Sequence, residues 1–171
     1  MIWPYVVLAL VAAGRLAELA FAHRNTRRLV VDGAVEVGAR HYPVLVVLHA
    51  AWLASLALSI DATTGIVAGW LALYAVLQIA RLWIMLTLGR FWTTRVMTLP
   101  GAPLVRHGPY RFLRHPNYLV VVLEIAVLPL VFGLVWQALI FSVLNGLLLW
   151  HRVRIEAAAL APRQAIEKGT S

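Results

Sequence analysis

The sequence contains no cysteine, which excludes disulfide bonds, thiolate metal sites and a cysteine nucleophile. It is also poor in charge, because charged residues make up 13% of the chain, against about 25% in an ordinary soluble domain. Hydrophobic residues make up 62% of the 171 residues, and a soluble protein of this length would leave too much of that apolar surface in water. The composition therefore predicts an integral membrane protein.

The sequence also shows no sign of a cleavable signal peptide or of a second domain. Its first four residues contain no basic side chain, and the apolar run that follows has no small-residue cleavage site. No Gly-rich loop lies between a strand and a helix, as a Rossmann-type cofactor domain would require. We therefore expect one membrane-embedded domain over residues 1–171.

Five apolar stretches predict an all-α fold of about five transmembrane helices. The expected spans are approximately 2–22, 43–60, 66–89, 117–133 and 135–150, followed by a C-terminal helix at about 151–162. A helix needs about 20 residues to cross the hydrocarbon, with a range of about 17–25, so the last two spans are short. Gly133 predicts a tight reversal between them. A re-entrant hairpin is the alternative to two full crossings.

Basic residues lie in alternate connections of this predicted topology. They occur in the loop at about 23–42, in the segment 90–116 and in the tail, while the connections around 61–65 and near Gly133 contain none. The positive-inside rule then predicts an N-outside, C-inside protein with the basic segments in the cytoplasm. The net charge of +8 is explained by topology and by attraction to anionic lipid headgroups. Nucleic-acid binding is not expected, because no recognition motif accompanies the charge.

Five ionisable residues lie inside the predicted spans, where charge is costly. They are Arg15, Glu18, His49, Arg81 and Glu124. Arg15 and Glu18 are three residues apart on one helix face, so we expect them to pair. Charges in a span usually face a partner or a cavity. Two interpretations stay open: pairing between helices that fixes the bundle, or a polar pocket reached from the cytoplasmic side.

The segment 104–118 has the chain's highest concentration of residues suited to binding or catalysis. It contains the turn signal Gly108-Pro109, and Pro116 suits the first position of a helix. The N-terminus of such a helix attracts a carboxylate or a phosphate. The rings of Tyr110 and Tyr118 are suited to a purine or, by cation–π attraction, to a sulfonium.

A second polar cluster follows the last predicted span. Arg152 and Glu156 are four residues apart and share a helix face, with Asn145 further back in the span. As an exposed ion pair, Arg152 and Glu156 would contribute only a few tenths of a kcal/mol to stability. Alternatively, Glu156 receives hydroxyls or an amine from a cofactor, and Arg152 steers an anionic substrate.

Both clusters resemble the isoprenylcysteine carboxyl methyltransferase family. The pattern Gly-Pro-Tyr-x-x-x-Arg-His-Pro-x-Tyr at 108–118 is followed by Arg-x-x-x-Glu-x-x-x-Leu at 152–160, and the resemblance covers about residues 88–160. Members of this family are integral membrane enzymes that use S-adenosylmethionine. The segments 24–28 and 33–43 look like the bacterial branch associated with type III polyketide synthases, which methylates hydroxyls of long-chain alkylpyrones or alkylresorcinols.

The resemblance implies site residues by position. Those implied to line the cofactor pocket are Val105, Gly108, Tyr110, Arg114, His115, Pro116, Tyr118 and Glu156. Arg152 is implied to lie near the methyl acceptor, a lipophilic hydroxyl or a prenylcysteine-type carboxylate. The family usually has Glu-Glu where this chain has Glu156-Ala157, which leaves the acceptor chemistry open. The implied location is the bacterial inner membrane, with the active site facing the cytoplasm.

Further residues are predicted from the chemistry of methyl transfer. A phenol or enol acceptor benefits from deprotonation by His or Glu, so His41 joins Arg152 and Glu156 as a catalytic candidate. The residues predicted to contact the lipophilic substrate are Glu36, His49, Trp92, Glu124 and Asn145. Each has a structural alternative, and for Trp92 it is an interface anchor. No metal site is predicted.

Three other functions remain possible at the level of sequence. A phospholipid N-methyltransferase would share the cofactor and the architecture but use an amine acceptor. NADPH-dependent membrane reductases also carry Arg-His-Pro-x-Tyr, but a Gly-Glu pair usually follows, where this chain has Leu119-Val120. A non-enzymatic scaffold would not explain why both motifs lie on one predicted side of the membrane.

Overall fold

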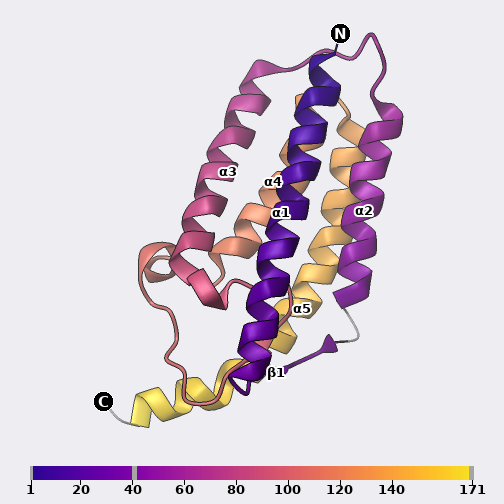
Figure 1. Cartoon of the computed structure of the whole chain (residues 1–171). Helices are drawn as coiled ribbons and strands as arrows, with labels where there is room; N and C mark the ends of the chain where they lie inside the picture. Colours follow the sequence, from indigo (N-terminus) through magenta and orange to yellow (C-terminus); the bar gives the residue numbers. More distant parts are fainter. Residues whose placement is uncertain (1, 40–41, 170–171) are drawn as a thin grey trace.

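The computed structural model describes the backbone of residues 2–39 and 42–169, and the side chains within these ranges up to residue 155. These residues form a bundle of α-helices with two very short strands (Figure 1). The helices are α1 (Trp3–Val31), α2 (Tyr42–Ser59), α3 (Ala68–Leu88), α4 (Pro116–Val131) and α5 (Val135–Gly169). The shorter elements are β1 (Val35–Glu36), β2 (Met97–Thr98) and the 3-10 turns η2 (Gly89–Phe91) and η3 (Gly108–Arg111).

Four stretches of helix are long and apolar enough to cross a membrane. They are Trp3–Val31, Tyr42–Ser59, Ala68–Phe91 and Val135–Ile155. The remaining helix, α4, is apolar but has only 16 residues. At 1.5 Å per residue it is about 24 Å long, shorter than a hydrocarbon core of about 30 Å. The mostly helical, multi-pass membrane fold predicted from composition is thus supported for four helices.

The first helix is longer than the sequence predicted. A span of 2–22 and a loop of about 23–42 were expected, but α1 continues to Val31, so residues 24–28 are helical. The loop prediction was wrong because no glycine or proline lies between Arg15 and Asp32 to end the helix after the predicted span, and Gly33 then leaves the helix at φ +92°. With 29 residues, α1 is about 43 Å long and extends beyond the hydrocarbon core.

The connection between α4 and α5 agrees with the sequence. The helix α4 begins at Pro116, the residue predicted to open it, and Gly133 reverses the chain at φ +73°. The helix α5 then runs from Val135 to Gly169 without a break. The separate helix expected at about 151–162 is therefore a continuation of α5, because no glycine or proline lies between residues 147 and 161.

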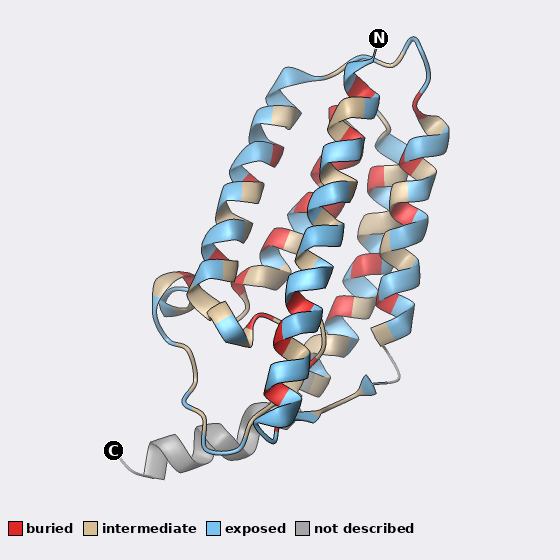
Figure 2. Ribbon diagram, in the orientation of Figure 1, coloured by how far each residue is buried: buried red, intermediate tan, exposed pale blue. Residues whose placement is uncertain are grey.

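Apolar side chains fill the bundle and also cover its outer surface. Trp52, Leu56 and Leu128 belong to the main buried cluster. Large apolar residues such as Leu58 and Leu86 are exposed, and Figure 2 shows exposed residues along the outward faces of the helices. An apolar exterior suits contact with lipid chains, which solvate apolar side chains as well as a protein core does.

The four charged residues of opposite sign predicted inside the spans form a closed ring of ion pairs. We refer to Arg15, Glu18, Arg81 and Glu124 as the ion-pair ring. Arg15 contacts Glu18 at 3.0 Å and Glu124 at 3.1 Å, while Arg81 contacts each of the same two carboxylates at 2.8 Å. The predicted pairing of Arg15 with Glu18 is confirmed. Because two arginines and two glutamates alternate, the ring joins α1, α3 and α4 without net charge.

Gln78 of α3 completes this network. Its carbonyl oxygen accepts a hydrogen bond from Arg15 at 2.7 Å, and its amide nitrogen donates one to Glu124 at 2.6 Å. The side chain of Glu124 is only 5% exposed. The structure therefore favours the interpretation that these residues pair between helices, because the carboxylate of Glu124 receives hydrogen bonds from both neighbouring helices.

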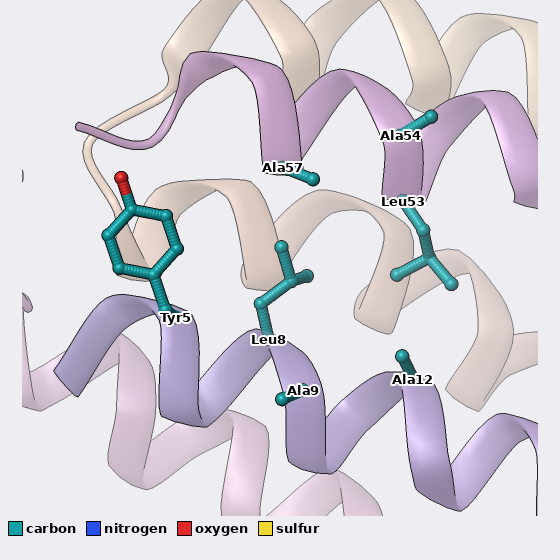
Figure 3. Close-up of a pocket in the computed structure, with 7 residues that line it drawn as sticks. All are labelled: Tyr5, Leu8, Ala9, Ala12, Leu53, Ala54 and Ala57. Atoms are coloured by element: carbon teal, nitrogen blue, oxygen red, sulfur yellow. The ribbon is translucent and has the colours of Figure 1, made fainter. Parts of the chain in front are cut away.

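An apolar groove lies between α1 and α2, near the N-terminal end of α1 (Figure 3). Its lining comes from both helices and consists of Tyr5, Leu8, Ala9, Ala12, Leu53, Ala54 and Ala57. Tyr5 donates a hydrogen bond from its hydroxyl to the carbonyl of Ile60 at 3.0 Å. None of the predicted site residues lines this groove.

Candidate active site

The turn η3 is shaped by a glycine that no other residue can replace without strain. Gly108 has φ +57°, and a Cβ atom placed on it would lie 2.7 Å from Oγ1 of Thr87 in α3. Pro109 occupies the first turn of η3 and is buried. The pair Gly108-Pro109, predicted as a turn, thus packs the segment against the end of α3.

Replacing Gly108 with alanine is expected to destabilise the protein by about 1–3 kcal/mol from backbone strain alone, with packing strain added. The added Cβ would also force Thr87 to move, because their separation is only 2.7 Å. Thermal unfolding in detergent is the measurement. Gly101→Ala is the matched control, since Gly101 has φ +76° but no heavy atom within 4 Å of a Cβ. Equal losses in both variants would contradict a packing role for Gly108.

The N-terminus of α4 places two aromatic rings of the motif together. His115 immediately precedes the helix, and Pro116 occupies its first turn. The rings of His115 and Tyr118 stack with centroids 5.4 Å apart and planes 19° apart. The next side chain, Asn117, has a buried Oδ1 with no hydrogen-bond partner within the described structure. A buried acceptor of this kind calls for a hydrogen-bond donor, either an ordered water or a ligand.

Arg152, from the motif at 152–160, contacts Tyr118, from the motif at 108–118. Its Nε donates a hydrogen bond to the hydroxyl of Tyr118 at 3.0 Å, and its Nη2 donates one to the carbonyl of Thr94 at 2.7 Å. The guanidinium also lies 5.7 Å from the centroid of the Tyr118 ring. The sequence proposed Glu156 as a partner for Arg152, but the side chain of Glu156 lies outside the described residues.

The segment after η2 joins the N-terminal half to these residues. Thr94 and Tyr42 share a hydrogen bond between their hydroxyls at 3.0 Å. Arg95 lies over the ring of Tyr42 at 4.6 Å and pairs with Glu36 at 2.6 Å. The strands β1 and β2 are antiparallel, with Glu36 opposite Met97. Glu36, predicted to contact substrate, is therefore engaged by Arg95.

Trp92 lies inside the protein and is not exposed at the membrane interface. Its side chain is 3% exposed, and Arg81 of the ion-pair ring lies 5.6 Å from its ring centroid. Asn25 of α1 donates hydrogen bonds to the carbonyls of Trp92 and Gly89, each at 3.0 Å. The alternative of an interface anchor was wrong, because the segment turns inward where Asn25 binds it.

Two other predicted substrate residues lie deeper in the bundle. His49 of α2 is half-buried, and its Nδ1 bonds with the carbonyl of Leu45 at 2.9 Å. Asn145 of α5 is 1% exposed, and neither of its amide atoms has a hydrogen-bond partner within the described structure. His49 is thus tied to its own helix, while Asn145 retains a buried donor and a buried acceptor.

The remaining predicted residues are placed as follows. Tyr110 packs beside the buried cluster that contains Trp92, Val105 is half-buried and Arg114 is exposed. His41, the predicted general base, lies outside the described residues. The structure thus brings His115, Tyr118 and Arg152 into one group.

Several residues of the site were not selected from the sequence. Gln78, Asn25 and Thr94 make the contacts described above; Asn25 lies within the segment 24–28 that resembles the bacterial branch, but none of the three was named as a site residue. A glutamine inside an apolar span was the one signal that could have identified Gln78. Asn25 was hidden by the prediction that residues 23–42 form a loop. Thr94 binds Arg152 through its backbone carbonyl, and because every residue has such a carbonyl, the residue type does not predict this contact.

Comparison with known proteins agrees with the motif resemblance. Residues 70–162 match the model of the isoprenylcysteine carboxyl methyltransferase family. The chain is 36% identical over 164 residues to "Uncharacterized protein YpbQ" of Bacillus subtilis (strain 168), which covers 94% of this chain and 96% of that protein. It is 25% identical over 169 residues to an "Uncharacterized protein" of Haemophilus influenzae, with the same shares covered. No solved structure matches the chain. The chain therefore belongs to the isoprenylcysteine carboxyl methyltransferase family, and this membership indicates a membrane methyltransferase.

Proposed function

We propose that the protein transfers a methyl group from S-adenosylmethionine to a lipophilic acceptor at the cytoplasmic side of the bacterial inner membrane. The observation that carries this proposal is the contact of His115, Tyr118 and Arg152. The first two belong to one family motif and the third to the other, and their contacts join the N-terminus of α4 to the middle of α5. The proposed cofactor pocket comprises the eight residues that the family resemblance implies.

The chemistry of these residues suits that cofactor. The ring of Tyr118, which already lies 5.7 Å from the Arg152 guanidinium, is of the kind that attracts a cation such as a sulfonium. The unpartnered Oδ1 of Asn117 suits a donor such as an ammonium or a ribose hydroxyl. The N-terminus of α4 favours a carboxylate. When bound, S-adenosylmethionine supplies an activated methyl group.

The proposed acceptor is the hydroxyl of a long-chain alkylpyrone or alkylresorcinol, with a prenylcysteine-type carboxylate as the second possibility. The acceptor keeps its alkyl chain in the bilayer and presents its head group near Arg152. The residues of the site then hold the two reactants in line and exclude water, and such positioning supplies about 7–11 kcal/mol of catalysis. Because Ala157 stands where the family has a second glutamate, the acceptor need not be a carboxylate.

Calorimetric binding to the detergent-solubilised protein tests the cofactor class. S-adenosylmethionine is expected to bind, and His115→Ala and Glu156→Ala are expected to abolish the binding. His107→Ala is the matched control, because His107 is exposed in the same segment and lies outside the proposed pocket. Binding of NADPH without S-adenosylmethionine binding would replace this proposal with a membrane reductase.

The proposed topology has five crossings, with the N-terminus outside. A chain without cysteine allows each position to be tested by a single introduced thiol. We expect Thr63→Cys and Val135→Cys to react with an impermeant thiol reagent added outside intact cells. Phe112→Cys, at a side chain 75% exposed, is expected to react only after the membrane is opened. Labelling of Thr63→Cys but not Val135→Cys from outside would instead favour a re-entrant α4–α5 hairpin.

A further inference from the structure

The guanidinium of Arg152 is oriented by two different parts of the chain. Its Nε bonds to Tyr118 in α4 at 3.0 Å, and its Nη2 bonds to the backbone carbonyl of Thr94 at 2.7 Å. Two bonds from different edges of a planar group fix both its position and its plane. The geometry at Arg152 therefore depends on where the Thr94 carbonyl is held.

The Thr94 carbonyl belongs to an irregular segment between η2 and β2, which is held by a backbone bond from Val37 to the carbonyl of Val96 at 2.9 Å and by side-chain contacts. Thr94 itself bonds through its hydroxyl to the hydroxyl of Tyr42 at 3.0 Å. The next residue, Arg95, covers the ring of Tyr42 at 4.6 Å and pairs with Glu36 at 2.6 Å. These contacts attach the segment to the start of α2 and to β1.

The geometry points to Tyr42 and the Glu36–Arg95 pair as positioning residues, which hold the Thr94 carbonyl against Arg152. This inference rests on the proposed function in one respect, namely that Arg152 lies at the methyl acceptor. Glu36 then acts through Arg95 and does not touch the substrate. The N-terminal half of the chain thus sets the geometry of a site whose motif residues lie in the C-terminal half.

These positioning residues are expected to affect catalysis more than stability. The side chains of Arg95 and Glu36 are 41% and 23% exposed, and ion pairs near the surface contribute little to folding. Methyl transfer, by contrast, depends on the alignment of donor and acceptor, and a displacement of about 1 Å can lower a rate roughly a hundredfold. Removing one anchor of Arg152 should therefore lower kcat while the protein remains folded.

Three substitutions separate the contacts. Tyr42→Phe removes the hydroxyl and keeps the ring under Arg95, whereas Glu36→Gln removes the charge that holds Arg95. Thr94→Val removes the hydroxyl on the other side of the Tyr42 hydrogen bond and keeps the backbone carbonyl. Because Tyr42→Phe and Thr94→Val break the same bond, the double variant should be no worse than either single variant.

The matched control is Arg90→Gln. Arg90 lies in the same region, stacks on Phe91 at 4.9 Å and pairs with Asp32 at 3.6 Å, so it has the same kinds of contact as Arg95. Neither of these partners contacts Arg152 or Thr94 in the described structure. Arg90→Gln is therefore expected to leave the geometry of Arg152 unchanged.

The first readout is the Nε–H resonance of Arg152 in protein carrying isotope-labelled arginine, assigned by its loss in Arg152→Lys. Tyr42→Phe and Glu36→Gln are expected to shift and broaden this resonance, and Arg90→Gln is not. The second readout is methyl transfer from labelled S-adenosylmethionine to a long-chain alkylresorcinol in micelles. Here kcat should fall about tenfold to a hundredfold, with the affinity for S-adenosylmethionine unchanged.

The two readouts separate this inference from the proposed function. An unchanged Arg152 resonance in both Tyr42→Phe and Glu36→Gln would overturn the positioning role, whatever the activity. If the substitutions shift the Arg152 resonance but the wild-type protein neither binds S-adenosylmethionine nor transfers methyl groups, the positioning of Arg152 is supported and the proposed function is overturned. If Arg90→Gln lowered kcat as much as Tyr42→Phe and Glu36→Gln do, the inference would also be overturned, because the loss would then not depend on the contacts of Tyr42.

Discussion

Replacing Arg81 with leucine is expected to destabilise the protein by about 3–5 kcal/mol, because it leaves Glu18 and Glu124 with excess negative charge in the bundle. Arg81 contacts both carboxylates at 2.8 Å, and the four side chains of the ion-pair ring are between 5% and 16% exposed. Arg15 contacts both carboxylates but neutralises only one of the two charges, and an uncompensated charge inside the bundle is costly. Unfolding in mixed micelles with increasing denaturing detergent measures the loss.

A second substitution that restores neutrality provides the control. Adding Glu18→Leu to Arg81→Leu leaves Arg15 paired with Glu124 at 3.1 Å, so much of the lost stability should return. Arg90→Leu is the matched single variant, because its pair with Asp32 is exposed and should contribute less than about 1 kcal/mol. If Arg81→Leu were no more damaging than Arg90→Leu, the ring would not be a major source of stability.

Replacing Arg152 with lysine is expected to lower methyl transfer about a hundredfold, with folding preserved. Lysine keeps the charge but cannot bond in two fixed directions, whereas Arg152 donates one bond to Tyr118 and another to Thr94. The change should appear in kcat more than in the affinity for S-adenosylmethionine. Single-turnover assays with a labelled methyl group measure it.

Arg154→Lys is the matched control for this prediction. Arg154 lies one turn or less from Arg152 on the same helix, is exposed, and stacks on Trp150 at 4.9 Å. It contacts neither Tyr118 nor Thr94 in the described structure, so its replacement should leave the rate unchanged. Full activity in Arg152→Lys would show that the charge alone, and not the orientation of the guanidinium, matters.

Local features of the structure followed from the sequence where one residue type dictates the backbone. Pro116 opens α4 because its missing N–H would be unpaired there anyway, and Gly133 reverses the chain with a positive φ. The pair of Arg15 with Glu18 followed from helical spacing. The family followed from the two motifs, which are specific in both residue type and spacing.

Contacts between distant parts of the chain did not follow from the sequence. Thr94 and Arg152 are 58 residues apart, and the bond uses a backbone carbonyl that every residue possesses. Glu36 was predicted to contact substrate because no nearby residue in the sequence indicated its pairing with Arg95, which is 59 residues away. The extension of α1 was missed because arginines near a span predict a water-exposed segment without saying whether it remains helical.

The polar contacts of α1 have a consequence for how this helix tolerates change in length. In lipid, helices gain little from burying apolar side chains, so polar contacts determine which face of a helix meets its neighbours. Tyr5, Arg15 and Asn25 bind their partners at three depths along α1. One inserted residue rotates everything beyond it by about 100°. An insertion between Arg15 and Asn25 therefore separates one contact from the others, whereas one after Leu29 leaves all three in phase.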